Sequence, residues 1–126
     1  LETVQTPAKR GFIRPRPFVT EPARICVPPE PWLAASGSYP SGHAALGWAW
    51  ALVLSEMAPD RADQILARGL AYGDSRAICG VHYASDVEAG RIVGAALFAA
   101  LKADPAFQAD FAIARRELAT ARQTSR

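Results

Sequence analysis

The sequence has few cysteines, few lysines and no long hydrophobic run, and each shortage narrows the class of protein. Two cysteines, Cys26 and Cys79, are too few for a disulfide-rich scaffold or a four-thiolate zinc site. The longest apolar stretches, residues 44–54 and 92–101, fall well short of the roughly 20 residues that span a bilayer. The formal net charge is only +2, whereas a nucleic-acid-binding domain carries a stronger basic excess. We therefore expect neither a membrane nor a nucleic acid as partner.

The N-terminal residues and the two cysteines bear on the cellular compartment. Residues 1–19 contain proline, lysine and arginine where a signal peptide needs an apolar stretch, so we expect no signal peptide within them. Cys26 and Cys79 either form one disulfide or stay as two buried thiols, and the sequence leaves both states open.

Proline divides the chain into two parts. Eight of the ten prolines fall at or before Pro40, so residues 14–40 are expected to form a long loop. Phe18, Trp32 and Leu33 are the apolar residues that we expect to anchor this loop to a core. No alternating strand pattern appears and half of the residues are apolar, so the expected fold class is all-α with a packed core.

Four helices are expected after the loop, and residues 1–12 resemble the end of another. Ser41 is a favourable N-cap for the first of the four. Gly73 is a favourable C-terminal residue for the second, and Ser85 with Glu88 has the spacing of a capping box for the third. The expected ranges are Ala44–Met57, Arg61–Tyr72, Ser85–Lys102 and Pro105–Arg122.

The two histidines stand out because each lies where a loop meets an expected helix. His43 follows Ser41-Gly42, and His82 follows Arg76 by six residues. Backbone N–H groups are unpaired at a helix N-terminus and stabilise an anion there. A single histidine is more often structural than catalytic, but two at similar junctions favour an anion-handling site.

Charged residues surround these histidines in the sequence. Asp86 lies four residues after His82, so the two share a helix face if the helix begins at or before His82. A carboxylate at one imidazole nitrogen fixes the tautomer and leaves the other nitrogen as a nucleophile. Asp86 also has a simple structural explanation, since a carboxylate is favourable in the first turn of any helix. Arg76, like Lys9 and Arg16, is suited to binding phosphate oxygens, although each alone is also compatible with an ordinary basic surface.

Three short motifs follow one another in the order and spacing of a known family. They are Lys9-x6-Arg16-Pro17, Pro40-Ser41-Gly42-His43 and Ser75-Arg76-x5-His82-x3-Asp86. The trio resembles the phosphatidic acid phosphatase type 2 superfamily. The segment 37–43 is similar to the signature of the bacterial class A non-specific acid phosphatases, with Ala44 where threonine is usual. The resemblance covers nearly the whole chain.

This resemblance implies a fold and a setting. The fold is a helical bundle of the acid phosphatase and vanadium haloperoxidase type, with a long proline-rich loop. Residues 1–126 correspond to the catalytic C-terminal half of a single acid phosphatase domain. The other half in the family is helical and packs against this one, so we expect either a missing N-terminal half or a partner chain, and a homo-oligomer stays open. Family members are periplasmic, which implies a periplasmic or secreted protein and permits a disulfide between Cys26 and Cys79.

The resemblance also implies a mechanism without metal or other cofactor. His82 attacks phosphorus and becomes a phosphohistidine, Asp86 orients it, and His43 protonates the leaving alcohol and then activates water. The phosphoryl oxygens are held by Lys9, Arg16, Arg76, Ser41, Gly42 and Ser75. The implied substrates are small phosphate monoesters, and phosphotransfer to nucleosides is compatible with the same chemistry. Phosphoryl transfer depends mainly on positioning and charge neutralisation, which three cations supply.

Two other functions stay open at this point. Vanadium-dependent haloperoxidases resemble the same three motifs, with the position of His82 binding vanadium and that of His43 acting in peroxide activation. The residues around Gly37 and the short spacing favour the phosphatase. A helical module that binds phosphate without turning it over is the non-enzymatic alternative, and an intact nucleophile, acid and orienting carboxylate argue against it. Membrane lipid phosphatases share the motifs, but the chain lacks their spanning segments.

Overall fold

The computed structural model describes residues 2–21 and 23–124, and every regular element in these ranges is a helix. This confirms the all-α fold class. The elements are α1 (Glu2–Gly11), α2 (Pro17–Thr20), α3 (Pro31–Ala35), α4 (Gly42–Met57), a 3₁₀ turn η1 (Pro59–Arg61), α5 (Ala62–Ile78), α6 (Ala84–Ala103) and α7 (Pro105–Thr124).

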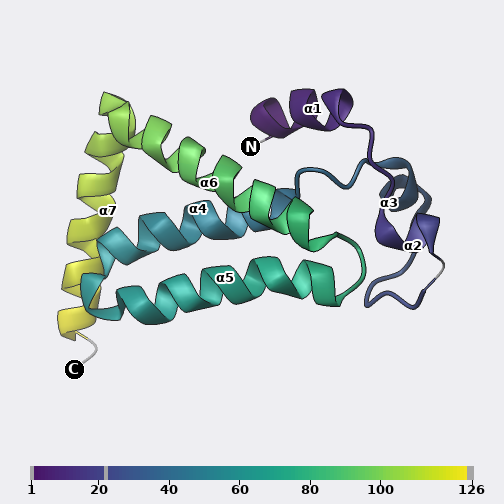
Figure 1. Ribbon diagram of the computed structural model, residues 1–126. Helices are drawn as coiled ribbons and strands as arrows, with labels where there is room; N and C mark the ends of the chain where they lie inside the picture. Colours follow the sequence, from purple (N-terminus) through teal and green to yellow (C-terminus); the bar gives the residue numbers. More distant parts are fainter. Residues whose placement is uncertain (1, 22, 125–126) are drawn as a thin grey trace.

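Helix α4 is the centre of the fold and packs against α5 on one side and α6 on the other (Figure 1). Helix α7 lies across one end of this group after a bend of 93° from α6. The segments α1 to α3 lie at the opposite end (Figure 1). No single helix among the described residues meets the length and hydropathy of a membrane span; α6 and α7 meet them only as a pair across their bend.

Glycines allow α6 to approach α4 closely. A Cβ atom on Gly90 would collide with the carbonyl oxygen of Ser41, and one on Gly94 would collide with the carbonyl oxygen of Ala45. The first turn of α4 is therefore held directly against the second and third turns of α6. The backbone N–H of Ser41 donates to the carbonyl of Asp86 at 2.9 Å, which fixes the two helix starts relative to each other.

Two expected helix signals were wrong. Helix α5 runs on to Ile78, because Gly73 lies buried inside it rather than at its end. A Cβ at Gly73 would sit 3.3 Å from Val87 and 3.4 Å from Ala44, so this glycine permits close helix packing. Helix α6 begins after Tyr83, whose N–H donates to the Asp86 carboxylate, so the cap does not use Ser85 and Glu88.

The proline-rich loop is more ordered than expected. It contains two short helices, α2 and α3, and each begins with a proline because proline has no N–H to satisfy there. Leu33 is buried with Cys79 and Val81, and Phe18 packs on this cluster, so both anchor the loop as expected. Trp32 does not, because 66% of its surface is exposed.

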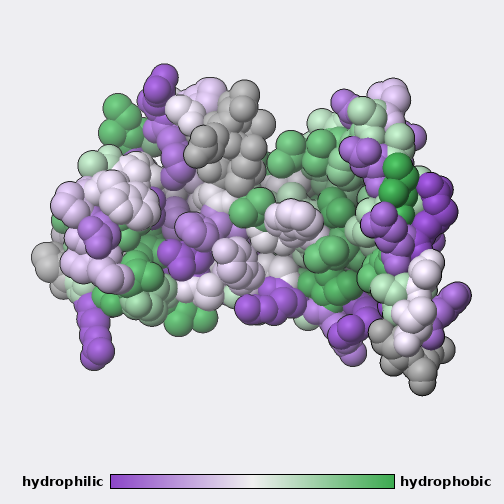
Figure 2. All heavy atoms as spheres, turned by 180° about the vertical axis from the view of Figure 1, so that it is seen from behind, coloured by the Kyte–Doolittle hydropathy of each residue, from purple (hydrophilic) through white to green (hydrophobic). Residues whose placement is uncertain are grey.

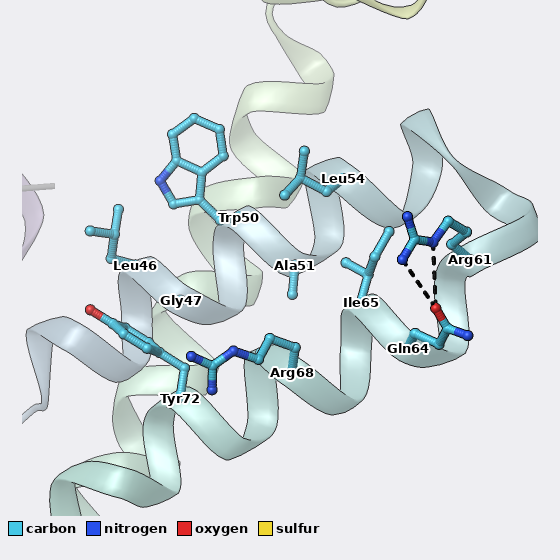
Figure 3. Close-up of a pocket in the computed structure, with 11 residues that line it drawn as sticks. Leu46, Gly47, Trp50, Ala51, Leu54, Arg61, Gln64, Ile65, Arg68 and Tyr72 are labelled. Carbon is cyan, nitrogen blue, oxygen red and sulfur yellow. Dashed lines mark hydrogen bonds between the residues drawn. The ribbon is translucent and has the colours of Figure 1, made fainter. Parts of the chain in front are cut away.

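An apolar groove runs along the outside of α4 and α5 (Figure 3). Its volume is about 440 Å³, and its walls include Leu46, Trp50, Leu54, Ile65 and Tyr72. Trp50 is 57% exposed, which is unusual for so large an apolar side chain. Apolar residues also reach the surface in patches on the face turned away from Figure 1 (Figure 2).

Candidate active site

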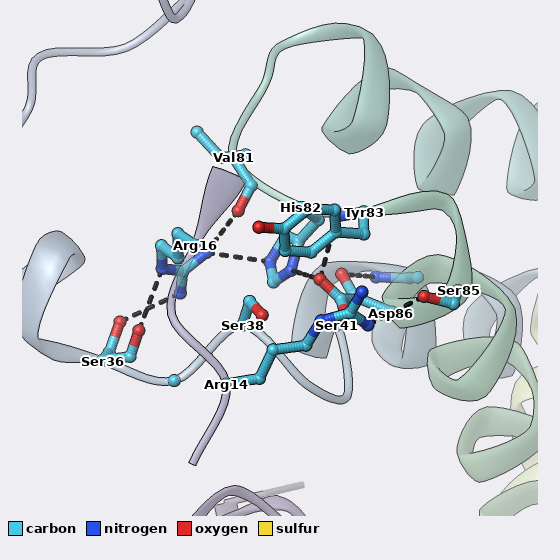
Figure 4. Close-up of polar contacts among 12 residues, drawn as sticks. Arg14, Arg16, Ser36, Ser38, Ser41, Val81, His82, Tyr83, Ser85 and Asp86 are labelled. Carbon is cyan, nitrogen blue, oxygen red and sulfur yellow. Dashed lines mark hydrogen bonds and ion pairs between the residues drawn. The ribbon is translucent and has the colours of Figure 1, made fainter. Parts of the chain in front are cut away.

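The candidate site forms where the loop before α2, the start of α4 and the turn between α5 and α6 meet (Figure 4). The three sequence motifs lie on these segments. Arg16 Nη1 donates to the carbonyl of Val81 at 2.9 Å, which ties the first motif to the third. Ser41 N–H ties the second motif to the third through the Asp86 carbonyl.

His82 is buried, with 4% of its surface exposed, and its two ring nitrogens face different partners. Nε2 lies 3.1 Å from Arg16 Nη1. Because arginine can only donate, Nε2 carries a lone pair and the ring proton is on Nδ1. Nδ1 faces Oδ2 of Asp86 at 3.4 Å, too long and poorly aligned for a good hydrogen bond. Burial, with the Arg16 charge second, lowers the pKa of His82 to about 4.

Asp86 is fully buried and its two oxygens are held by groups other than His82. Oδ2 accepts the N–H of Tyr83 at 2.8 Å, and Oδ1 accepts Arg14 Nη1 at 2.8 Å. Arg14 also donates to Ser85 Oγ at 2.8 Å, and its guanidinium lies 4.0 Å from the centroid of the Tyr83 ring. The carboxylate therefore serves both as the cap of α6 and as the group behind the histidine.

Arg14 is a residue that the sequence reasoning missed. A usable signal was its spacing from Arg16, since side chains two residues apart on an extended segment point to the same side. The backbone at Arg16 is extended, with φ −74° and ψ 155°. Arg14 reaches Asp86 and Arg16 reaches His82, so one Arg-Pro-Arg segment contacts both members of the pair (Figure 4).

Arg16 is held by backbone carbonyls and is only 5% exposed. Nε donates to the carbonyls of Leu33 at 2.8 Å and Ser36 at 3.1 Å, and Nη2 donates to Ser36 Oγ at 2.9 Å. These contacts fix the guanidinium before any ligand arrives, and they link it to α3. Burial, and then the nearby charge of Arg76, lower the pKa of Arg16.

A cavity of about 340 Å³ opens in front of these groups. Four predicted site residues line it: Arg16, His43, Arg76 and His82. The buried Nε of Arg76 has no hydrogen-bond partner among the described residues, so this donor is unpaired there. His43 is reached by solvent, but the surrounding walls and then Arg76, Arg16 and Lys9 lower its pKa.

The remaining predicted residues do not all reach this cavity. Lys9 Nζ donates to the carbonyl of Gly37 at 2.6 Å, and it acts on the site through its charge, which lowers the pKa of both histidines. Ser41 Oγ accepts the N–H of Ala44 at 3.3 Å and caps α4, whose first residue is Gly42. Ser75 is exposed and donates to the carbonyl of Tyr72 at 2.7 Å, so the structure does not bring it to the cavity.

The chemistry of this cavity suits an oxyanion. Two arginines and two imidazoles line it and supply positive charge, N–H donors and one unprotonated ring nitrogen, against the single carboxylate of Glu30. Within residues 2–21 and 23–124, no group of three or more histidine, cysteine or carboxylate side chains has the arrangement of a metal site.

Comparison with known proteins shows the family. The sequence model of the PAP2 superfamily matches residues 2–108. The chain belongs to this superfamily. It is 52% identical over 112 residues to a non-specific acid phosphatase of Salmonella typhimurium, covering 88% of this chain and 45% of that protein. It is 45% identical over 119 residues to an acid phosphatase of Zymomonas mobilis, covering 94% of this chain and 45% of that protein.

A third relative gives the same picture. A non-specific acid phosphatase of Providencia stuartii is 47% identical over 113 residues, which cover 89% of this chain and 46% of that protein. The chain therefore spans a little under half the length of the curated relatives that it matches.

Proposed function

We propose that the protein hydrolyses phosphate monoesters through a phosphohistidine on His82, without a metal ion. The contact that carries this proposal is the 3.1 Å approach of Arg16 Nη1 to His82 Nε2. It sets a fixed cation beside the unprotonated nitrogen of a neutral histidine. A phosphoryl group bonded to that nitrogen lies beside Arg16, and Arg76, which lines the same cavity, adds a second cation.

In the first step, the hydrogen bond from Arg16 Nη1 to Nε2 breaks, and the Nε2 lone pair forms a bond to phosphorus while the bond from phosphorus to the ester oxygen breaks. The leaving oxygen takes a proton from the His43 imidazolium, so an alcohol departs. The ring of His82 now carries a positive charge, which the buried Asp86 carboxylate behind Nδ1 stabilises. The cations Arg16, Arg76 and Lys9 balance the charge of the transferring phosphoryl group.

In the second step, neutral His43 takes a proton from water, and the water oxygen forms a bond to phosphorus. The bond between phosphorus and Nε2 breaks, which releases inorganic phosphate and restores neutral His82. An alcohol in place of water, such as a nucleoside, makes the same step a phosphotransfer. The names of the relatives, acid phosphatase and non-specific acid phosphatase, support this reading over halide oxidation.

Trapping the intermediate tests the proposal. The intact protein is mixed with a ³²P-labelled aryl phosphate and quenched with alkali, because phosphohistidine is stable in alkali and labile in acid. We expect label on the wild type and none on His82→Gln. With an aryl ester the leaving group needs little acid assistance, so His43→Gln still takes up label and then releases it slowly.

Two outcomes would overturn the proposed metal-free phosphohistidine mechanism. One is turnover by His82→Gln at the wild-type rate, and the other is activity that disappears with chelator and returns with a divalent cation. Arg76→Met is expected to lower kcat/KM because it removes a cation from the cavity, and Arg116→Met, which removes an exposed arginine outside it, is the matched control. Halide oxidation that needs vanadate and peroxide, with no ester hydrolysis, would identify the haloperoxidase instead. Phosphate binding with neither activity would identify a binding module.

We also propose that residues 1–126 are the catalytic C-terminal half of one acid phosphatase domain, and that a further helical segment covers the groove between α4 and α5. The exposed Trp50 and the relatives' greater length support this. Trp50→Arg in the intact protein then lowers stability and activity more than Ile113→Arg, which changes another exposed apolar residue. Equal effects would contradict the idea, and a concentration-dependent dimer would identify a second copy as the cover.

The resemblance to periplasmic phosphatases leads us to propose a periplasmic or secreted location. Cell fractionation tests it directly. Activity and antigen are expected in the periplasmic or culture fraction, and retention with a cytoplasmic marker would contradict the proposal.

A further inference from the structure

The cavity has an apolar wall that the proposed chemistry does not use. Arg16, His43, Arg76 and His82 line its charged part. Val27, Pro28, Trp32 and Leu33 line another part, with the carboxylate of Glu30 beside them. None of these five side chains has a role in moving the phosphoryl group or a proton. They belong to the loop segment 27–33, which the sequence suggested only as an anchored connection.

Trp32 is the notable member of this wall. It is 66% exposed, whereas its neighbour Leu33 is 6% exposed and belongs to the core with Val81. The backbone of α3 is well fixed at this point, because the Leu33 carbonyl accepts Arg16 Nε at 2.8 Å and the Trp32 carbonyl accepts the N–H of Ser36 at 3.0 Å. The guanidinium that contacts His82 thus also holds the backbone of the short helix that carries Trp32.

From this arrangement we propose that Val27, Pro28 and Trp32 form a leaving-group subsite, and that it selects phosphate monoesters whose ester oxygen carries a flat, uncharged aromatic ring. The proposal rests on the hydrolysis proposed above. A phosphoryl group held at the charged end leaves the ester substituent inside the same 340 Å³ cavity. The apolar wall is the surface there that it can cover.

The chemistry of the wall favours a ring over a sugar alcohol or an anion. An indole face attracts another aromatic ring beyond simple area burial, whereas a small polyol loses water contacts on an apolar surface. Glu30 makes no side-chain hydrogen bond at the start of α3 and has no ion-pair partner among the described residues. Its carboxylate therefore disfavours a leaving group that carries a second negative charge.

Binding of two non-hydrolysable phosphonates tests the subsite independently of turnover. Phenylphosphonate and methylphosphonate share the anionic head and differ in the ring. Calorimetric titration of the intact protein is expected to show that Trp32→Leu weakens phenylphosphonate about fivefold and leaves methylphosphonate unchanged within about twofold. Trp32→Phe, which keeps a ring, is expected to stay close to the wild type. Ile113→Ala is the matched control at an exposed apolar side chain outside this cavity.

The outcomes separate this inference from the proposed function. Equal changes for both phosphonates in Trp32→Leu, or no change for either, would overturn the subsite. If Trp32→Leu does not fold, loss of ring preference in Val27→Asp with Trp32 intact decides the same point. Ring-selective binding without any phosphoenzyme would refute the hydrolysis and leave the ring preference standing. Failure of the wild type to bind either phosphonate would refute both.

Discussion

Arg14 Nη1 lies 2.8 Å from Oδ1 of Asp86, the carboxylate that faces the buried histidine. The Arg14 side chain is 38% exposed, whereas the Asp86 side chain is fully buried, so the ion pair bridges the surface and the interior. The other oxygen of Asp86 is held by Tyr83 N–H. Arg14 and Tyr83 together fix the carboxylate, so Asp86 cannot rotate freely away from His82.

In the proposed reaction, we therefore expect Arg14 to act as a positioning residue through Asp86. We expect Arg14→Ala to lower kcat about tenfold, equivalent to about 1.4 kcal/mol on the barrier, with little change in KM. The Asp86 charge raises the pKa of His82. Without the Arg14 cation beside it, the Asp86 charge acts on His82 more strongly, so the pKa of His82 should rise. The acid limb of the kcat/KM profile should consequently move to higher pH. Steady-state kinetics across pH measures both effects.

A merely structural role for Arg14 would lower activity without moving the acid limb. Arg14→Lys should restore part of kcat, since a lysine keeps the charge but loses the fork geometry. Arg10→Ala, at an exposed arginine in the last turn of α1, is the matched control and should behave as the wild type. If kcat/KM falls only because KM rises, Arg14 contacts the substrate directly instead of acting through Asp86.

The lowered pKa values of the two histidines predict that kcat/KM follows a bell-shaped pH profile with its maximum at mildly acidic pH. His82 must be neutral to attack, and its pKa is lowered to about 4, so kcat/KM should rise with pH through about 4. His43 must be protonated to act as an acid, and its pKa is lowered from 6.5. Activity should therefore fall with rising pH at a value below 6.5 in the free enzyme.

Lys9 provides an internal check on that profile. Its charge lowers the pKa of His43, so Lys9→Met should move the alkaline limb to higher pH even though total activity falls. Activity that keeps rising above neutral pH in the wild type would contradict His43 as the acid. An unmoved alkaline limb in Lys9→Met would show that another group titrates there.

Gly90 is expected to be intolerant of a side chain. A Cβ atom there would meet the Ser41 carbonyl and lie 2.9 Å from the Ala44 Cβ, so α4 and α6 must separate. Gly90→Ala should destabilise the fold by about 1–3 kcal/mol and reduce activity, because the shift displaces the His43 motif from Asp86. Chemical denaturation with a parallel activity assay measures both. Gly11→Ala, where nothing lies within 4 Å, should be neutral or slightly stabilising.

The two cysteines should be distinguishable by reactivity. They are unbonded in the structure, with Cys26 exposed and Cys79 buried, and the backbone N–H of Cys26 donates to Cys79 Sγ at 3.1 Å. The hydrogen bond between the thiols raises the pKa of Cys26, so its thiol should react slowly at neutral pH. A thiol reagent should modify one cysteine in the native protein and two after unfolding. No free thiol in unfolded, unreduced protein would show the disulfide instead.

The helices after the loop were predictable because their signals are local. Proline at a first turn, a serine cap and an apolar stripe act over a few residues. Gly73 was misread because the same residue serves as a helix end or as a close contact, and only the presence of Val87 and Ala44 decides between them. The short helices of residues 14–40 were hidden because each spans about one turn, which packing rather than propensity stabilises.

The sequence by itself determined the fold class, the superfamily and the identity of the histidine pair, since these depend on residue types at short, fixed spacings. Tertiary structure alone decided which cations lie near the two histidines and Asp86. It turned Ser75 outward, bound Arg14 to Asp86 across 72 positions of sequence, and left Trp32 exposed on the cavity wall. These choices depend on how α4 and α6 close against the loop, and no local pattern records a contact between segments so far apart.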